Sequence, residues 1–193
     1  MILLLDIGNT HTHLGLANQK RVVKRANIPT ARWFGNTAAA LIKRFVGEAR
    51  VDGAALCSVV PRATPLARRA VKRLWNIAPV ELTPRTVRGV GINYPRPQTI
   101  GPDRLANAVA VRHHFGAPAV VVDFGTAVTF DVVDRRGDYV GGIIAPGVVV
   151  PLHSHPEPET FIAISGRIEG LKESDGKFGW VSIGPGDVFH VPG

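Results

Sequence analysis

The sequence contains a single cysteine, Cys57, among its 193 residues. One thiol excludes an internal disulfide framework and favours a reducing compartment, so we expect a cytoplasmic protein. Cys57 follows the apolar residues 54–56, which favours a small buried hydrophobe over a nucleophile. The opening apolar run, residues 1–5, stops at Asp6 and is too short for a signal-peptide core or a membrane span. We therefore expect no membrane partner.

Acidic residues are scarce in most of the chain, and the net charge is +8. Residues 151–193 hold three Lys or Arg and six Asp or Glu, so residues 1–150 carry a net charge of +11. A basic cluster at 68–73 lacks the interleaved aromatics that single-strand binders use, which favours a solvated helix face over a nucleic-acid partner. Because the sign of the charge changes near residue 150, the composition predicts a change of segment there.

Hydrophobic patterns predict an α/β fold. Strands are predicted at 2–5, 11–17, 22–28, 54–59, 79–82, 119–122, 128–133 and 139–145, and helices at 36–45, 65–75 and 101–116. A meander followed by alternating helices and strands indicates a mixed sheet with helices packed on it.

Two similar motifs each follow a predicted strand and lead into a hairpin. They are Asp6-Ile-Gly-Asn-Thr10 and Asp123-Phe-Gly-Thr-Ala127, an internal repeat that predicts two homologous lobes, the second starting near residue 118. Backbone amides in such turns can bind phosphate, Gly allows close approach, and the Asp can hold a bridging cation. Ordinary hairpin turns are the alternative, but two copies favour phosphate binding. The chain has no Walker-type motif.

Gly101-Pro102-Asp103-Arg104 opens a predicted helix. Pro and Asp are common capping residues at a helix start, which is one interpretation. The other makes Asp103 a general base beside Arg104, suited to an anionic substrate whose alcohol proton it accepts during phosphoryl transfer. The motif alone leaves both open.

Four motifs in this order resemble those of type III pantothenate kinases, over residues 1 to about 147. They are 6–10, 101–104, 123–127 and Gly141-Gly-Ile-Ile-Ala-Pro-Gly147. The resemblance implies an acetate-kinase/actin-like fold of two ribonuclease-H-like lobes. It also implies a homodimer that transfers the γ-phosphoryl group of ATP, with Mg²⁺, to pantothenate, the first step of coenzyme A biosynthesis.

The resemblance also implies the site residues. Asp103 would be the catalytic base, Tyr94 would help the 101–104 motif to hold pantothenate, and Asp123 would hold a monovalent cation, K⁺ or NH₄⁺. The pantothenate residues of that motif would be Gly101, Pro102, Asp103 and Arg104. The ATP-binding residues would be Asp6, Ile7, Gly8, Asn9, Thr10, His11, Thr12, His13 and Thr126.

The resemblance divides the chain into a first lobe at 1–117, an incomplete second lobe at 118–147 and a further segment at 148–193. The meander at 119–145 is followed by no covering helix, so we expect an exposed apolar face there and another at 160–192, with self-association as the result. Phosphoryl transfer depends on positioning, so we expect a poor catalyst from this chain alone.

The further segment resembles the first conserved motif of the cupins, small metal-binding β-barrels. The matching residues are Gly147, His153, His155, Glu159 and Gly166. Two imidazoles and a carboxylate on one strand face suit a divalent transition metal, whereas Pro156 and Pro158 favour a His-rich surface loop. Residues 184–187 resemble the cupin turn and 188–192 the strand after it, too little chain to close a barrel. The alternative function is thus a metal-binding cupin-like module or a non-catalytic fusion.

Overall fold

The computed structural model describes residues 1–124, 128–145, 159–162, 168–174, 177–183 and 188–191. The chain divides into two compact units. Unit 1 is Met1–Val87 with Gln98–Ala106, and unit 2 is Arg88–Pro97 with the chain from Asn107 onward. The division falls inside helix α3 (Pro102–Phe115).

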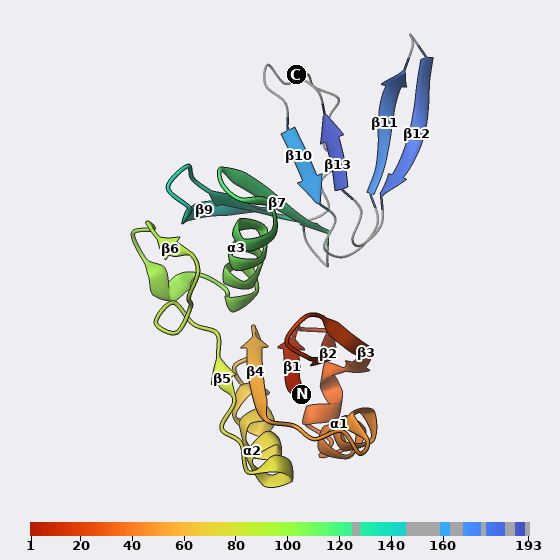
Figure 1. Ribbon diagram of the computed structural model, residues 1–193, viewed down its shortest axis with the longest axis vertical. Helices are drawn as coiled ribbons and strands as arrows, with labels where there is room; N and C mark the ends of the chain where they lie inside the picture. The colour runs from red at the N-terminus through yellow and green to blue at the C-terminus, as the bar shows by residue number, and fades with distance from the viewer. Residues whose placement is uncertain (125–127, 146–158, 163–167, 175–176, 184–187, 192–193) are drawn as a thin grey trace. The chain divides into compact units, whose positions relative to one another are not determined.

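Unit 1 is built on a five-stranded sheet with the order β3-β2-β1-β4-β5 (Figure 1). Its strands are β1 (Ile2–Ile7), β2 (His11–Ala17), β3 (Val22–Pro29), β4 (Gly53–Ser58) and β5 (Val80–Glu81). The first three form an antiparallel meander, and β4 and β5 continue the sheet parallel to β1. The mixed sheet agrees with the prediction from the sequence pattern, and its topology is that of the ribonuclease-H-like lobe that the family resemblance implies.

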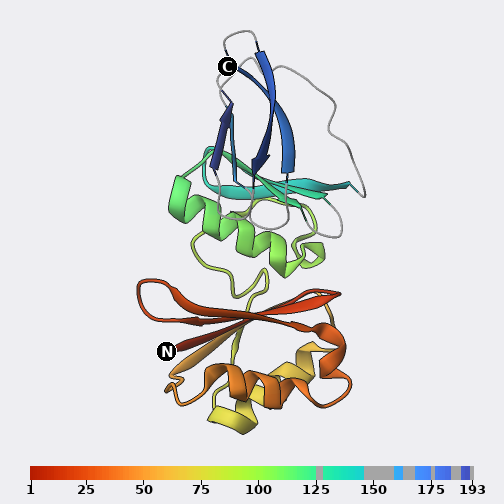
Figure 2. The ribbon, with the colours of Figure 1, turned by 90° about the vertical axis from the view of Figure 1, so that its right-hand side faces the viewer.

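Helices cover one face of this sheet. Helices α1 (Ala38–Val46) and α2 (Thr64–Trp75) lie on the same side of it (Figure 2). Alternation along β1 turns Leu3, Leu5 and Ile7 into the core beneath the helices, where each is at most 2% exposed. The same alternation turns Leu4 and Asp6 to the opposite face, where they are only partly covered.

Unit 2 contains a four-stranded sheet with the order β6-β9-β8-β7. Its strands are β6 (Gly91–Ile92), β7 (Ala119–Phe124), β8 (Val128–Val133) and β9 (Asp138–Ala145). Strands β7, β8 and β9 form the predicted meander, and the short β6 adds a parallel strand to β9.

The expectation that no helix covers this meander is wrong. The part of α3 that belongs to unit 2 packs on the sheet, with Ala108 fully buried and the Asn107 side chain bonded to Asp131 of β8. In the chain, α3 follows the strands of the first sheet and precedes β7 of the second sheet. Its sequence alone therefore does not reveal which sheet it covers. Apolar side chains are nevertheless exposed on the sheet, since Val120 is 42% and Ile143 is 67% accessible.

The C-terminal strands form two antiparallel pairs. Strand β10 (Glu159–Ile162) pairs with β13 (Val188–Val191), and β11 (Ile168–Ser174) pairs with β12 (Lys177–Ile183). Strand β13 confirms the strand predicted after residue 187. The predicted turn at 184–187 lies outside the described residues.

Candidate functional site

The turn between β1 and β2 is the first part of the candidate site. The Gly8 N–H donates to the His11 carbonyl oxygen at 2.9 Å and closes the turn. A Cβ atom at position 8 would lie 3.1 Å from that oxygen, so glycine lets the two backbones approach. Asn9, Thr10 and His11 are exposed, so this turn offers its outer edge to a ligand.

A buried hydrogen-bond network holds the turn from behind. The Thr30 N–H donates to the Thr10 carbonyl at 2.9 Å, and its hydroxyl donates to the Gly8 carbonyl at 2.7 Å. The Thr30 and Thr12 hydroxyls lie 3.1 Å apart, and Trp33 Nε1 donates to Thr12 Oγ1 at 3.0 Å. Thr12 is wholly buried, as is Ile7, so both support the shape of the turn from inside the lobe.

A row of polar side chains crosses the open face of the sheet beside this turn. Asp6 is the register partner of His13 on β2 and of Cys57 on β4, and His13 is in turn the partner of Asn27 on β3. His13 Nδ1 and Asn27 Oδ1 lie 2.8 Å apart. Asp6 and His13 are among the site residues predicted from the sequence, whereas Asn27 and the proximity of Cys57 were not predicted, because strand register decides both.

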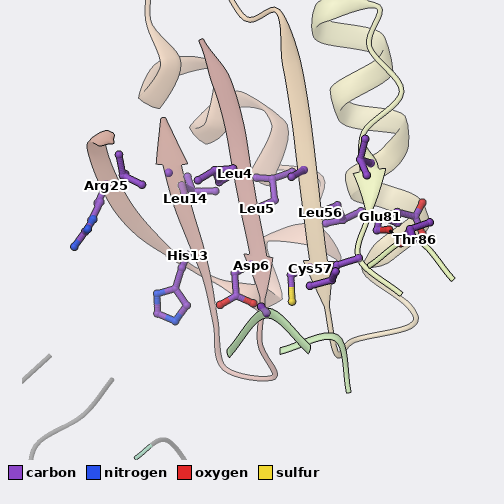
Figure 3. A pocket seen from close by; sticks show the side chains of 16 residues that line it. Leu4, Leu5, Asp6, His13, Leu14, Arg25, Leu56, Cys57, Glu81 and Thr86 are labelled. Carbon is purple, nitrogen blue, oxygen red and sulfur yellow. Dashed lines mark hydrogen bonds between the residues drawn. The ribbon is translucent and has the colours of Figure 1, made fainter. Parts of the chain in front are cut away.

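Asp6, His13 and Cys57 border a groove of about 440 Å³ on this face, and Figure 3 shows how their side chains lie. Its apolar lining includes Leu4, Leu14 and Leu56. Every residue that lines it, Ala106 of α3 included, belongs to unit 1. The groove therefore has a carboxylate and an imidazole at its border and apolar side chains along its lining.

The pKa of the Cys57 thiol reflects the burial and the charges around it in the groove. Burial raises the pKa of its thiol, and the nearby Asp6 and Asp103 carboxylates and a hydrogen bond with Asp6 raise it further. The thiol is thus protonated at neutral pH, which agrees with the sequence-based rejection of a nucleophile. Since both carboxylates act on one thiol, Asp6 and Asp103 lie in the same region of unit 1.

Asp103 lies in the first turn of α3, where the positive end of the helix favours a carboxylate. Its Oδ1 accepts the Arg104 N–H at 2.9 Å. A side chain at Gly101 would collide with this carboxylate, so glycine makes room for it. This hydrogen bond uses one oxygen, and a carboxylate has a second acceptor, so the bond is compatible with proton acceptance.

Unit 2 carries the other expected substrate and cation residues. Tyr94 follows β6 and is half-buried against Tyr139, with ring centroids 6.3 Å apart. Asp123, near the end of β7, is half-buried opposite Thr129 of β8. Thr126 lies outside the described residues.

The cupin-like residues can be followed only in part. His153 and His155 lie outside the described residues, and Glu159 begins β10. Within the described ranges, no three or more His, Cys, Asp or Glu side chains gather as metal ligands would. No helix in those ranges has the length and apolarity needed to cross a membrane.

Solved structures to which this chain is similar include the Aquifex aeolicus Ppx/GppA phosphatase and the ROK hexokinase from Thermus thermophilus. The first has a TM-score of 0.47 and 15% identity, covering 75% of this chain and 51% of that chain. The second has a TM-score of 0.39 and 18% identity, covering 76% of this chain and 50% of that chain.

The curated relatives share more sequence identity with this chain than these two solved structures do. The type III pantothenate kinase of Streptomyces avermitilis is 39% identical over 165 residues, which cover 80% of this chain and 62% of the relative. That of Akkermansia muciniphila is 41% identical over 148 residues, covering 76% of this chain and 57% of the relative. The chain thus spans about three fifths of the length of the curated relatives it matches. The family described as type III pantothenate kinase matches residues 2–154, a range that includes all four motifs, and the chain belongs to that family.

Proposed function

We propose that the protein phosphorylates pantothenate with ATP to give 4'-phosphopantothenate, the first step of coenzyme A biosynthesis. The observation that carries the proposal is that Asp6, beside the turn after β1, and Asp103, in the first turn of α3, belong to the same compact unit. Family membership supports the choice of reaction.

The turn after β1 is the ATP phosphate site in this proposal. Its exposed residues Asn9, Thr10 and His11 lie where backbone amides can meet phosphate oxygens. The exposed Asp6 carboxylate suits Mg²⁺, a hard cation that prefers oxygen ligands and neutralises phosphate charge when bound. Thr126 is proposed as a further ATP contact, and Asp123 as the ligand of K⁺ or NH₄⁺.

Tyr94 and the 101–104 motif are the proposed pantothenate residues. Arg104 is suited to pair with the carboxylate of pantothenate, since its guanidinium presents a planar fork of donors. Asp103 would accept the proton of the pantothenate hydroxyl. The hydroxyl oxygen would form a bond to the γ-phosphorus of ATP while the bond between that phosphorus and ADP breaks.

The test is Asp103→Asn in an assay that couples ADP release to pantothenate addition. The variant keeps the size of the side chain and removes the base, so the rate is expected to fall by about 10²–10⁴-fold. Glu48→Gln is the matched control, because Glu48 is an exposed carboxylate of the same unit. Equal, background-level rates in wild type and Asp103→Asn would remove the proposal.

Two further properties belong to the proposal. A homodimer is supported by the exposed Val120 and Ile143 side chains as well as by the family resemblance. A cytoplasmic location is supported by the single thiol in 193 residues.

The cupin-like metal site at His153, His155 and Glu159 is kept as a separate proposal, supported by its ligand spacing alone. The kinase family match extends to residue 154 and so includes His153. Metal content of the purified protein tests it, since His153→Ala/His155→Ala should lose a bound divalent metal. Identical metal content in both proteins would eliminate the site.

A further inference from the structure

Unit 2 contains a buried carboxylate that the sequence motifs do not explain. Asp131 of β8 is fully buried. Tyr139 Oη donates to its Oδ1 at 3.3 Å, and Asn107 Nδ2 donates to its Oδ2 at 3.4 Å. Burying a carboxylate is costly unless hydrogen bonds compensate for the lost water. This one joins three elements, α3, β8 and β9, at a single point.

The same cluster reaches Tyr94. The Tyr139 carbonyl accepts the Asn93 N–H at 2.9 Å, which ties the segment after β6 to β9. The Tyr94 ring then meets the Tyr139 ring edge-on, with 6.3 Å between centroids and 63° between planes. This is a favourable aromatic geometry. Tyr139 therefore touches Asp131 with its hydroxyl and Tyr94 with its ring.

Gly141 lies on the other side of the position that the Tyr94 ring occupies. We call this position, between Tyr139 and Gly141, the seat of the Tyr94 ring. A Cβ atom at position 141 would lie 3.2 Å from Tyr94 Cε2 and 3.4 Å from Cδ2. The residue also has φ of +132°, a conformation that other residues rarely adopt. Glycine at the start of the 141–147 motif thus lets the Tyr94 ring lie directly on β9.

We infer that Asp131 is a positioning residue for Tyr94, acting through Tyr139, and that Gly141 completes the seat of the Tyr94 ring. Asp131 fixes the Tyr139 hydroxyl, Tyr139 packs against the Tyr94 ring, and Gly141 leaves room for that ring. The inference deepens the proposed function and rests on it in one respect, that pantothenate is the ligand that Tyr94 meets. It makes Asp131 and Gly141 determinants of pantothenate affinity that do not touch pantothenate themselves.

The chain offers a clean probe, because Tyr94 and Tyr139 are its only two tyrosines. Protein labelled with ¹³C in the tyrosine rings gives two sets of ring resonances, which Tyr94→Phe and Tyr139→Phe assign. Asp131→Asn and Gly141→Ala are expected to shift the Tyr94 resonances before any ligand is added. Asp134→Asn is the matched control, since Asp134 caps the turn between β8 and β9 and its loss tests general destabilisation of that hairpin.

Calorimetric titration with pantothenate gives the second readout. Tyr139→Phe removes one hydroxyl and keeps the ring, so the Tyr94 ring loses part of its support and we expect pantothenate binding to weaken by about twofold to thirtyfold, the range found for substitutions that act on a ligand without touching it. ATP affinity should stay unchanged in the same variant. A purely structural cluster would lower thermal stability and the active fraction but would not separate the two ligands.

The two readouts distinguish failure of the inference from failure of the proposed function. Tyr94 resonances that stay in place in Asp131→Asn, Tyr139→Phe and Gly141→Ala would overturn the inference. If the resonances move but the wild type does not bind pantothenate, positioning of Tyr94 stands and the proposed ligand falls. Should Asp131→Asn fail to fold, Tyr139→Phe and Gly141→Ala decide the question.

Discussion

The Thr30 hydroxyl donates a hydrogen bond of 2.7 Å to the carbonyl oxygen of Gly8, 22 residues earlier in the chain. Thr30 is 2% exposed, and its hydroxyl also contacts that of Thr12, which is fully buried. The outer edge of the turn is therefore free to face a ligand while its inner edge is fixed by the lobe. Rigid support of this kind is what a phosphate-binding turn requires.

Replacing Thr30 with Val should destabilise the protein. Valine matches the shape of threonine but leaves the Gly8 carbonyl and the Thr12 hydroxyl without this partner in a buried place. We expect a loss of about 1–3 kcal/mol in the free energy of unfolding, measured with urea, and a higher KM for ATP. Thr37→Val is the control, because Thr37 is exposed and its hydroxyl makes only a 3.5 Å contact. Similar effects of the two substitutions would contradict the supporting role of Thr30.

Gly101→Ala tests the room that glycine makes for Asp103. The new methyl group would collide with the Asp103 carboxylate, so the carboxylate must move. A displacement of about 1 Å at a reacting group can cost 10²-fold in rate, so kcat should fall steeply while the fold persists. Gly35→Ala is a matched control, since a Cβ atom there has no neighbour within 4 Å. Unchanged kcat in Gly101→Ala would mean that the position of Asp103 is unimportant.

Much of the fold could be predicted from the sequence, because apolar alternation specifies local structure. Each strand and helix predicted before residue 146 is present, with ends that differ by at most two residues. The two-residue strand β6 carries no periodic pattern, so its pairing with β9 could not be foreseen. The packing of α3 on the second sheet depends on tertiary contacts of Asn107 and Ala108, which the helix pattern does not encode.

Some residues of the candidate site could likewise be predicted from the sequence, and others could not. Motifs identified Asp6 and Asp103 because their neighbours in the chain are distinctive, and the family resemblance added Tyr94. Strand register, by contrast, brings Cys57 beside Asp6, and the pairing of β6 with β9 brings Tyr139 near Tyr94, which follows β6. Such pairing cannot be read from either strand alone. Residues that support a site from another strand are therefore the ones that sequence analysis misses.

The Cys57 thiol should react slowly with an electrophile and accelerate when Asp6 is neutralised. Burial and the neighbouring carboxylates raise its pKa, so little thiolate is present at pH 8. Asp6→Asn removes one of these carboxylates, lowers the pKa and should increase the labelling rate several-fold at that pH. The lone cysteine makes the rate easy to measure, with Glu48→Gln as a control for loss of charge. Faster labelling in the control alone would contradict the proximity of Asp6.

The raised pKa of Cys57 also predicts the direction of a pH effect on stability. The folded protein holds the thiol proton more tightly than the unfolded chain, whose thiol has a pKa of about 8.5. The stabilisation that the protonated Cys57 thiol provides is therefore fully present at a pH below the pKa of the unfolded chain. It is lost progressively as the pH rises from that pKa toward the higher pKa of the folded protein. Urea unfolding at about pH 7.5 and pH 10 should show a larger loss for wild type than for Cys57→Ala. A pH dependence that is the same in both proteins would show that the thiol has no part in it.

Self-association should depend on the exposed apolar residues of the second sheet. Ile143 is 67% accessible and Val120 is 42% accessible, and burying such side chains against a second copy would be favourable by the hydrophobic effect. Light scattering at micromolar concentration should give a mass above that of one 20.7 kDa chain. Ile143→Lys should shift the mass toward that of the monomer, because a charge on this face opposes burial, whereas Arg135→Lys in the turn between β8 and β9 should not. A wild-type protein that scatters as a monomer would rule out this face as an interface, and a dimer unaffected by Ile143→Lys would place the interface elsewhere.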